Sequence, residues 1–158
     1  MSPPEFLRRL GSYPPGEWLW MLEAAILLAW ARFLIRFVPF RHWRRWMGPI
    51  GPNAPQKPLS ERDRIRVRLT HRWIKLVAAR APFRAVCLPQ AMAARWMLAW
   101  RGIATDLHIG SRPAGDPSAA KPVDLHAWLL CGDRCLTGAD QRAQFTAFTQ
   151  PRERLGKA

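Results

Sequence analysis

The sequence predicts an α+β fold in which a helix that begins at a cysteine packs on a small antiparallel sheet. Two observations predict it. Apolar residues recur at helical spacing in the first part of the chain, and short alternating segments separated by glycine follow in the second part. The length of 158 residues suits one domain with a modest core, and 49% apolar residues exclude a disordered polar chain. A further helical segment is expected at the N-terminal side of the cysteine-bearing helix and its sheet.

The first predicted helix spans residues 17–37 and is mostly apolar. Within residues 18–31 only Glu23 is charged, and Arg32 and Arg36 then interrupt the apolar run, so it falls short of the roughly 18 uncharged residues of a membrane span. Alternating Arg and Trp follow at residues 41–46, a composition typical of a membrane headgroup region or a protein-docking surface. The sequence leaves open whether this helix packs on its own domain, on a partner or on a membrane.

The second predicted helix follows a linker that Gly and Pro punctuate at residues 48–58. It begins at Ser60, whose side chain can cap it together with Asp63, and it ends before Pro82. Four apolar residues at helical spacing predict its inner face: Ile65, Leu69, Trp73 and Leu76.

The third predicted helix runs from Leu88 to Arg101, where Gly102 ends it. A strand over residues 103–110 and a Pro/Gly/Asp-rich loop follow. The remaining alternating segments predict a hairpin of residues 125–130 and 134–137, and a last short strand at residues 144–148. The predicted domain organisation is therefore an N-terminal apolar and basic segment at 1–58, a domain at 59–150 and a tail at 151–158.

The positive charge is uneven along the chain. The formal net charge is +14, and residues 32–80 carry 13 Lys and Arg against only two acids. Such a segment faces an anionic partner or is simply a solvated surface. One hypothesis is therefore a non-catalytic basic module that binds membrane or nucleic acid.

Cys87 is the candidate nucleophile because it lies just ahead of the third helix. The positive end of the helix dipole stabilises a thiolate, and the N–H groups of the first turn can hold an oxyanion. The alternative is a buried structural cysteine, the commoner fate of this residue type. The other two cysteines, Cys131 and Cys135, are three residues apart with no second ligand pair, so we expect neither a metal site nor a cofactor. Three cysteines and no evident secretory signal favour a reducing, cytoplasmic setting.

His126 is the candidate base for this thiol. A neutral imidazole can accept the thiol proton and later protonate a leaving amine. On a strand, His126 and Trp128 share one face, so that the indole shields the imidazole from water. The alternative is a half-buried histidine without a catalytic role, and nothing in the sequence links the other histidines, His42, His71 and His108, to Cys87.

A base of this kind needs an orienting partner, and three acids are candidates: Asp124, Asp133 and Asp140. The hairpin register decides among them. A two-residue turn at residues 132–133 turns Asp140 away from His126, whereas a longer turn or a bulge at Gly138 brings it opposite. Asp140 is the predicted third member on that condition, and a backbone group that orients the imidazole is the alternative.

Several short motifs, in order, resemble the lasso-peptide leader peptidases, which are transglutaminase-like maturation proteins. They are Arg84-x-x-Cys87-Leu88, Arg101-Gly102-Ile103, Leu107-x-Ile109-Gly110 and His126-Ala127-Trp128, and the resemblance covers roughly residues 60–150. It implies a core like that of papain and the transglutaminases. It also implies a Cys–His–Asp triad in which Cys87 matches the nucleophile, His126 the base and Asp140 the third position less closely.

The resemblance implies a cysteine peptidase that cleaves the leader from a ribosomally made lasso-peptide precursor. The implied partners are the precursor leader, a small leader-recognition protein and a synthetase-like cyclase. Nucleic acid is not expected, and peripheral membrane contact through the first helix stays open. A transglutaminase or amidase that uses the same Cys–His pair is the enzymatic alternative.

Overall fold

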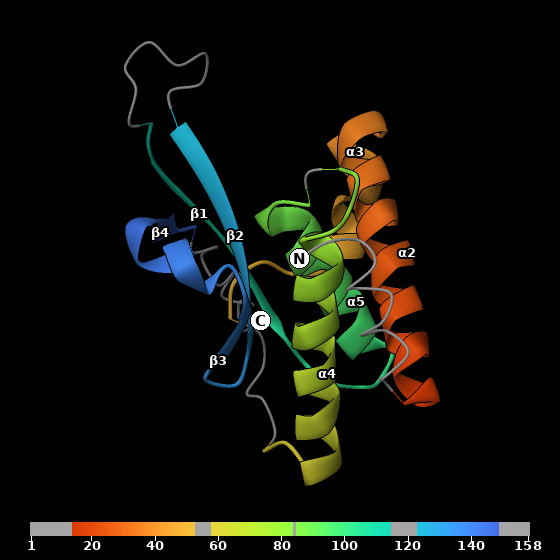
Figure 1. Ribbon diagram of the computed structural model, residues 1–158. Coiled ribbons are helices and arrows are strands. Elements are labelled where there is room, and N and C mark those ends of the chain that lie inside the picture. Colours follow the sequence, from red (N-terminus) through yellow and green to blue (C-terminus); the bar gives the residue numbers. More distant parts are fainter. Residues whose placement is uncertain (1–13, 53–57, 84, 115–122, 149–158) are drawn as a thin grey trace, which may run out of the picture.

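The computed structural model describes residues 14–52, 58–83, 85–114 and 123–148, and it shows helices stacked on one side of a small sheet (Figure 1). Three long helices form the helical layer: α2 (Pro15–Phe37), α4 (Glu61–Ala78) and α5 (Cys87–Ala99). Two short helical turns, α3 (Phe40–Trp43) and η1 (Arg44–Met47), follow α2.

The sheet has four strands in the order β3-β2-β1-β4, and every neighbouring pair is antiparallel. Its strands are β1 (Asp106–Pro113), β2 (Val123–Cys131), β3 (Arg134–Thr137) and β4 (Thr146–Ala147). The 3-10 helix η2 (Ala139–Gln144) connects β3 to β4. The α+β fold class is confirmed, with an N-terminal helix ahead of a helix that begins at cysteine and packs on a small antiparallel sheet.

The central element is α5, which contacts α2, α4 and β2. Its many small residues allow close approach on several sides, so it is buried over most of its circumference rather than on one face. At the C-terminal end of α5, Ala99 is exposed and Trp96 is half-buried. The fully buried residues of α5 are Ala91, Met92, Ala93, Ala94, Met97 and Leu98.

The predicted start of α4 is confirmed, but its predicted inner face is only partly right: Trp73 is buried, and Leu69 and Leu76 are half-buried against the core. Ser60 caps the helix by accepting a hydrogen bond from the Asp63 backbone N–H at 3.2 Å. Ile65 is 45% exposed. The face that packs on α2 and α5 instead carries Val67, Thr70, Trp73 and Ile74. Trp73 belongs to both the predicted and the observed face, and tertiary packing buries Val67, Thr70 and Ile74 beside it in place of Ile65.

One face of α2 packs on the core of its own chain. Ala24, Leu28 and Ala31 are fully buried there. The Arg101 guanidinium, at the end of α5, makes two hydrogen bonds to the Glu23 carboxylate, at 2.5 and 2.7 Å, and lies 3.9 Å from the centre of the Trp20 ring. A paired charge and a cation–π contact of this kind fix the helix against α5.

The opposite face of α2 is apolar as well, which raises the question of whether the helix could span a membrane. The helix has 23 residues and contains an 18-residue stretch with a mean hydropathy of 1.6, so it is long and apolar enough to cross a bilayer, criteria that core helices of soluble proteins also meet. The sequence had suggested that the uncharged run was too short. The two results agree once the charges are considered: the helix is apolar on average although Glu23 interrupts its uncharged run, and in the fold Glu23 is paired with Arg101.

Candidate active site

Cys87 is the first residue of α5, in the position that the sequence predicts. Val86 precedes it in extended conformation, and Pro89 is accommodated in the first turn, where its missing N–H is not needed. The Gln90 side-chain amide donates to the Ala85 carbonyl at 2.6 Å, which ties the approach to the helix back onto its first turn. The thiol is half-buried and lies where the N–H groups of the helix lack intrahelical acceptors.

His126 lies on β2, opposite Gly110 of β1, and only 6% of it is exposed. Its ring contacts two aromatic rings, with Phe145 at 5.0 Å and Trp128 at 6.0 Å between ring centres. The expectation that His126 and Trp128 share a face is confirmed. Trp128 in turn stacks on His108 at 5.6 Å, so a column of rings holds the imidazole in one orientation.

The Gly138 carbonyl decides which ring nitrogen of His126 is available. Nε2 lies 2.9 Å from this oxygen. A carbonyl oxygen only accepts hydrogen bonds, so Nε2 carries the hydrogen and Nδ1 carries the lone pair. The imidazole is therefore held, by a backbone group, in the tautomer that a base needs.

Gly138 is where β3 ends and the chain turns past the imidazole. It adopts a left-handed conformation, with φ of 74°. A Cβ at this position would lie 2.5 Å from the Ala127 oxygen and 2.9 Å from His126 Nε2. Both the conformation and the space therefore require glycine here.

The hairpin register combines features of the two alternatives. Its turn is the two-residue one at Gly132-Asp133, so Cys131 pairs with Arg134. A bulge then occurs at Leu136, two residues earlier than the suggested Gly138, because Leu129 pairs with Thr137 while Leu130 pairs with Cys135. The ladder stops at Thr137, and the following residues form η2 instead of facing His126.

The three predicted site residues, Cys87, His126 and Asp140, line one pocket of about 570 Å³. The pocket lies along the edge of β2 that β3, with only four residues, leaves uncovered. In the described part of the chain, no hydrogen bond joins the Cys87 thiol to the imidazole, or Asp140 to the imidazole. Catalytic hydrogen bonds commonly tighten only when substrate binds.

The other two candidate acids lie in different settings. Asp124 also lines the pocket, but its carboxylate accepts a hydrogen bond from Arg112 Nε at 3.2 Å. Arg112 in addition bonds the Gln144 side chain and lies 4.7 Å from the Phe145 ring centre, so this cluster forms the rim beside His126. Asp133 is exposed on the hairpin turn.

His71 is a pocket residue that the sequence does not connect to Cys87. It projects from α4, and its Nδ1 lies 2.6 Å from the Leu136 carbonyl, which leaves Nε2 with the lone pair. Lys75, one helical turn later, lines the same pocket. The spacing of the two residues on one helix face was visible in the sequence, but nothing there indicated that this face meets β3.

We expect a thiol reagent at neutral pH to modify Cys87 well before the other two cysteines. Burial raises the pKa of the Cys131 and Cys135 thiols, so both stay protonated and react slowly. Mass spectrometry after limited iodoacetamide treatment should find one label, on the peptide that contains Cys87. The Cys87→Ser variant should lose this label, and equal labelling of Cys131 would contradict the prediction.

The described residues contain no cluster of three or more His, Cys, Asp or Glu side chains that could hold a metal ion. The pocket brings the Cys87 thiol and the His126 imidazole together with the His71 imidazole and the Lys75 amine. Cys131 contacts the Ala104 carbonyl and Cys135 the Thr137 carbonyl, and both interactions are local to the sheet and its flanking loop.

Comparison with known proteins identifies the family. No curated protein and no solved structure matches the chain significantly. The family description of the transglutaminase-like superfamily matches residues 20–150, which includes most of α2 as well as the helix that begins at Cys87 and all four strands. Its members are generally cysteine peptidases or transglutaminases. With most of its length matched, the chain belongs to the transglutaminase-like superfamily.

Proposed function

We propose that this protein is a cysteine peptidase that removes the leader from a ribosomally made lasso-peptide precursor. The observation that carries the proposal is the shared pocket. Cys87 at a helix N-terminus and His126 on a neighbouring strand open into one space, with the His126 tautomer fixed by the Gly138 carbonyl. The resemblance of the motifs around Cys87 and His126 to the leader peptidases supports the substrate class.

The proposed reaction proceeds through an acyl-enzyme. Nδ1 of His126 accepts the proton of the Cys87 thiol, and the thiolate adds to the scissile carbonyl carbon. The C–N bond then breaks, and the leaving amine takes the proton from the imidazolium. Water, deprotonated by the same nitrogen, attacks the thioester. The C–S bond breaks, the second fragment leaves as a carboxylic acid, and the Cys87 sulfur takes the proton back from the imidazolium.

Backbone groups of α5 supply the oxyanion stabilisation in this scheme. The first-turn N–H groups next to Cys87 lie at the positive end of the helix dipole, where the negative oxygen of the tetrahedral intermediate would form. Gln90 acts as a positioning residue, since its bond to the Ala85 carbonyl holds the chain that leads into Cys87.

In the proposed mechanism, the Gly138 carbonyl orients the His126 imidazole. Asp140 is an acidic group in the pocket wall. Asp140 lies in η2 and is exposed, whereas the carbonyl is already 2.9 Å from Nε2. A neutral acceptor of this kind fixes the ring and its tautomer, although it stabilises an imidazolium less than a carboxylate would.

The proposed partners follow from the same reaction class. A small recognition protein would bind the leader and present the precursor to the pocket, and a synthetase-like cyclase would close the ring of the released core. The proposed setting is the cytoplasm, where the precursor is made and where thiols stay reduced.

The test is the mass of the products when the protein, its recognition protein and the precursor are incubated with an added primary amine. We expect two fragments whose masses sum to that of the precursor plus one water, and no cleavage by Cys87→Ala. Incorporation of the amine without cleavage would replace the peptidase by a transglutaminase, and hydrolysis of a side-chain amide without cleavage would replace it by an amidase. Equal cleavage by wild type and Cys87→Ala would overturn the use of the thiol.

A further inference from the structure

The face of α2 that points away from the core carries a continuous row of large apolar side chains. They recur every three or four residues, which places them on one side of the helix. They are between 44% and 71% exposed. We call this row the outer stripe, and it consists of Leu19, Leu22, Ile26, Trp30, Phe33 and Phe37.

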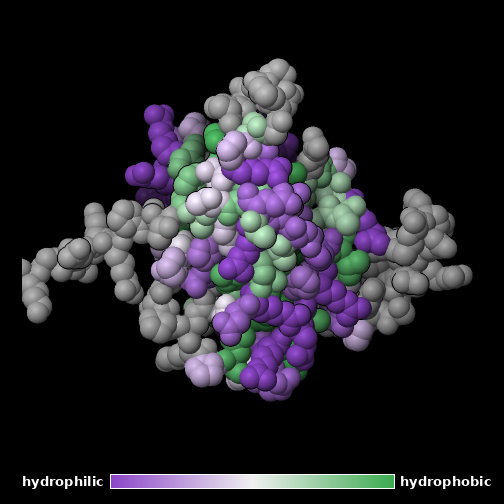
Figure 2. Space-filling model, turned by 90° about the vertical axis from the view of Figure 1, so that its left-hand side faces the viewer, coloured by the Kyte–Doolittle hydropathy of each residue, from purple (hydrophilic) through white to green (hydrophobic). Residues whose placement is uncertain are grey.

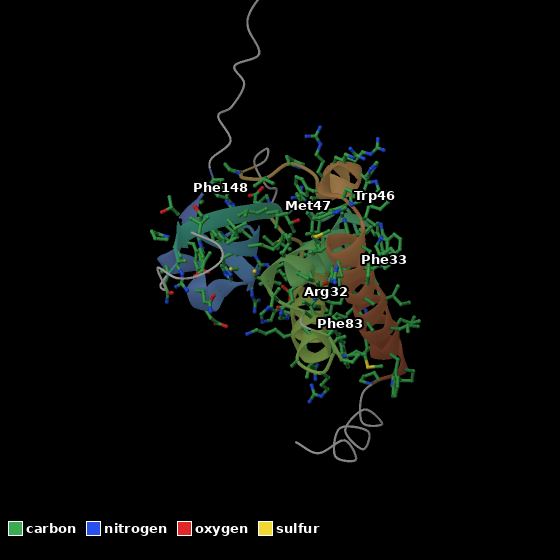
Figure 3. All side chains as sticks on the ribbon, turned by 90° about the horizontal axis from the view of Figure 1, so that it is seen from above. Arg32, Phe33, Trp46, Met47, Phe83 and Phe148 are labelled. Atoms are coloured by element: carbon green, nitrogen blue, oxygen red, sulfur yellow. The ribbon has the colours of Figure 1, made fainter. Side chains whose placement is uncertain are left out.

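Aromatic contacts extend the outer stripe onto η1. Trp30 stacks on Phe33 at 5.5 Å and on Trp46 at 6.5 Å between ring centres. The Trp46 backbone is fixed from inside the fold, because the Trp96 indole donates to its carbonyl at 2.8 Å. Seen from above in Figure 3, Phe33 and Trp46 lie on the side away from the sheet, whereas Met47 lies on the inner side.

Both acids of α2 are used in pairs with arginines of the other long helices or their ends. Glu23 pairs with Arg101, and Glu17 lies 3.4 Å from Arg72. No acid occurs in α3 or η1. The exposed charges beside the outer stripe are therefore positive, and they belong to Arg36, Arg41, Arg44 and Arg45.

The side of the molecule that faces away from α2 has a different character. Hydrophilic residues run down the middle of that face, and apolar residues are scattered over it (Figure 2). A long apolar row with only cations beside it is thus a particular feature of α2 and η1. Exposed apolar patches of this kind mark interaction sites.

We propose that the outer stripe and its arginines bind the surface of an anionic lipid bilayer, with α2 lying in the plane of the membrane. An apolar face bordered by arginine and tryptophan matches the depth profile of a bilayer, in which acyl chains meet anionic headgroups. A flat bilayer needs no hydrogen bonds from the stripe, and the six side chains of the stripe offer only the indole N–H of Trp30.

An in-plane helix fits better than a spanning one because of the inner face of α2. Its residues pack along α4 and α5, and α4 is rich in arginine. A spanning orientation would place those arginines in hydrocarbon, at a high cost for each. In the plane, only the exposed face meets lipid and the core stays intact.

Membrane binding in this orientation leaves the pocket open. The residues that line it come from α4, α5 and the sheet with its connections, and none comes from α2, α3 or η1. The bilayer would thus hold the protein without covering Cys87 or His126.

The test is co-sedimentation of the full-length protein with vesicles of phosphatidylcholine alone or mixed with phosphatidylglycerol. We expect strong binding to the anionic vesicles only, weakened by salt. Phe33→Glu should lower the partition coefficient by about tenfold or more, because it places a charge among the acyl chains. Ile65→Glu, at a residue of α4 with 45% exposure against 46% for Phe33, should change it less than about twofold.

A second variant keeps the test independent of folding defects in α2. Replacing Arg44 and Arg45 together by Glu touches no buried side chain and should lower partitioning to anionic vesicles by at least about 30-fold. Cys87 alkylation rates equal to wild type would show that each variant is folded. Equal vesicle binding by wild type and Phe33→Glu would overturn the proposal. The proposal would also be overturned if the wild-type protein did not bind vesicles but bound an acidic protein partner, and the Phe33→Glu variant lost that partner.

Discussion

The Gly138→Ala variant is expected to form the acyl-enzyme about 100-fold more slowly than wild type. Its free energy of unfolding should be ~2–4 kcal/mol lower. The added methyl group would lie 2.5 Å from the Ala127 oxygen and 2.9 Å from His126 Nε2. Neither neighbour can yield easily, because one is strand backbone and the other belongs to a stacked column of rings. The imidazole must therefore move from the position in which Nδ1 serves as base.

Gly132→Ala is the matched control for this variant. Gly132 also has a positive φ, of 58°, and flanks the other end of β3, but no atom lies within 4 Å of a Cβ built there. The Gly132→Ala variant should lose only the conformational contribution of glycine, about 1 kcal/mol in the free energy of unfolding, and its rate of acyl-enzyme formation should stay within about twofold of wild type. Single-turnover assays and denaturant unfolding measure both quantities, and equal rate losses in the two variants would show that contact with His126 is unimportant.

Local sequence signals predicted most of the fold. Ser60 with Asp63 gave the start of α4, and glycine with aspartate at 132–133 gave the hairpin turn. The cysteine before Pro89 gave the start of α5, because proline in a first turn marks a helix boundary whatever the tertiary environment. These features depend on backbone chemistry within a few residues, which is why they can be read without a structure.

The features that sequence could not give are those set by packing between distant segments. The buried face of α4 was only partly predicted, because packing against α2 and α5 selects it: Trp73 is buried as expected, but Ile65 is exposed. The bulge at Leu136 could not be located, since either register satisfies the alternation of the hairpin. The same long-range pairing brings His71 beside Leu136 and into the pocket, although it is 65 residues away in sequence.

The candidate site, like the fold, has some features set by local sequence and others set by packing between distant segments. The setting of Cys87 depends on local sequence, whereas the group that orients His126 depends on where β3 ends. Because the bulge shortens the ladder, the Gly138 carbonyl reaches Nε2, and Asp140 is carried into η2. The alternative in which a backbone group orients the imidazole therefore has a structural basis, and the three pocket residues His126, His71 and Asp140 can be separated by experiment.

His126→Ala is expected to lower the rate of precursor cleavage by about 10³-fold, the loss typical of a removed general base. His71→Gln and Asp140→Asn should each lower it less than about tenfold. His71 contributes a second imidazole at the pocket wall, held by the Leu136 carbonyl, and Asp140 makes no described bond to His126.

Added imidazole gives a readout that a purely structural role would not move. Imidazole should restore part of the cleavage rate of His126→Ala, because the small molecule can occupy the space that the missing side chain leaves next to Phe145 and Trp128. It should have no effect on His71→Gln. A 10³-fold loss in His71→Gln with rescue by imidazole would make His71 the base. A loss of about 100-fold or more in Asp140→Asn, at unchanged stability, would show that the carboxylate orients His126 during the reaction and that the carbonyl bond is only its resting arrangement.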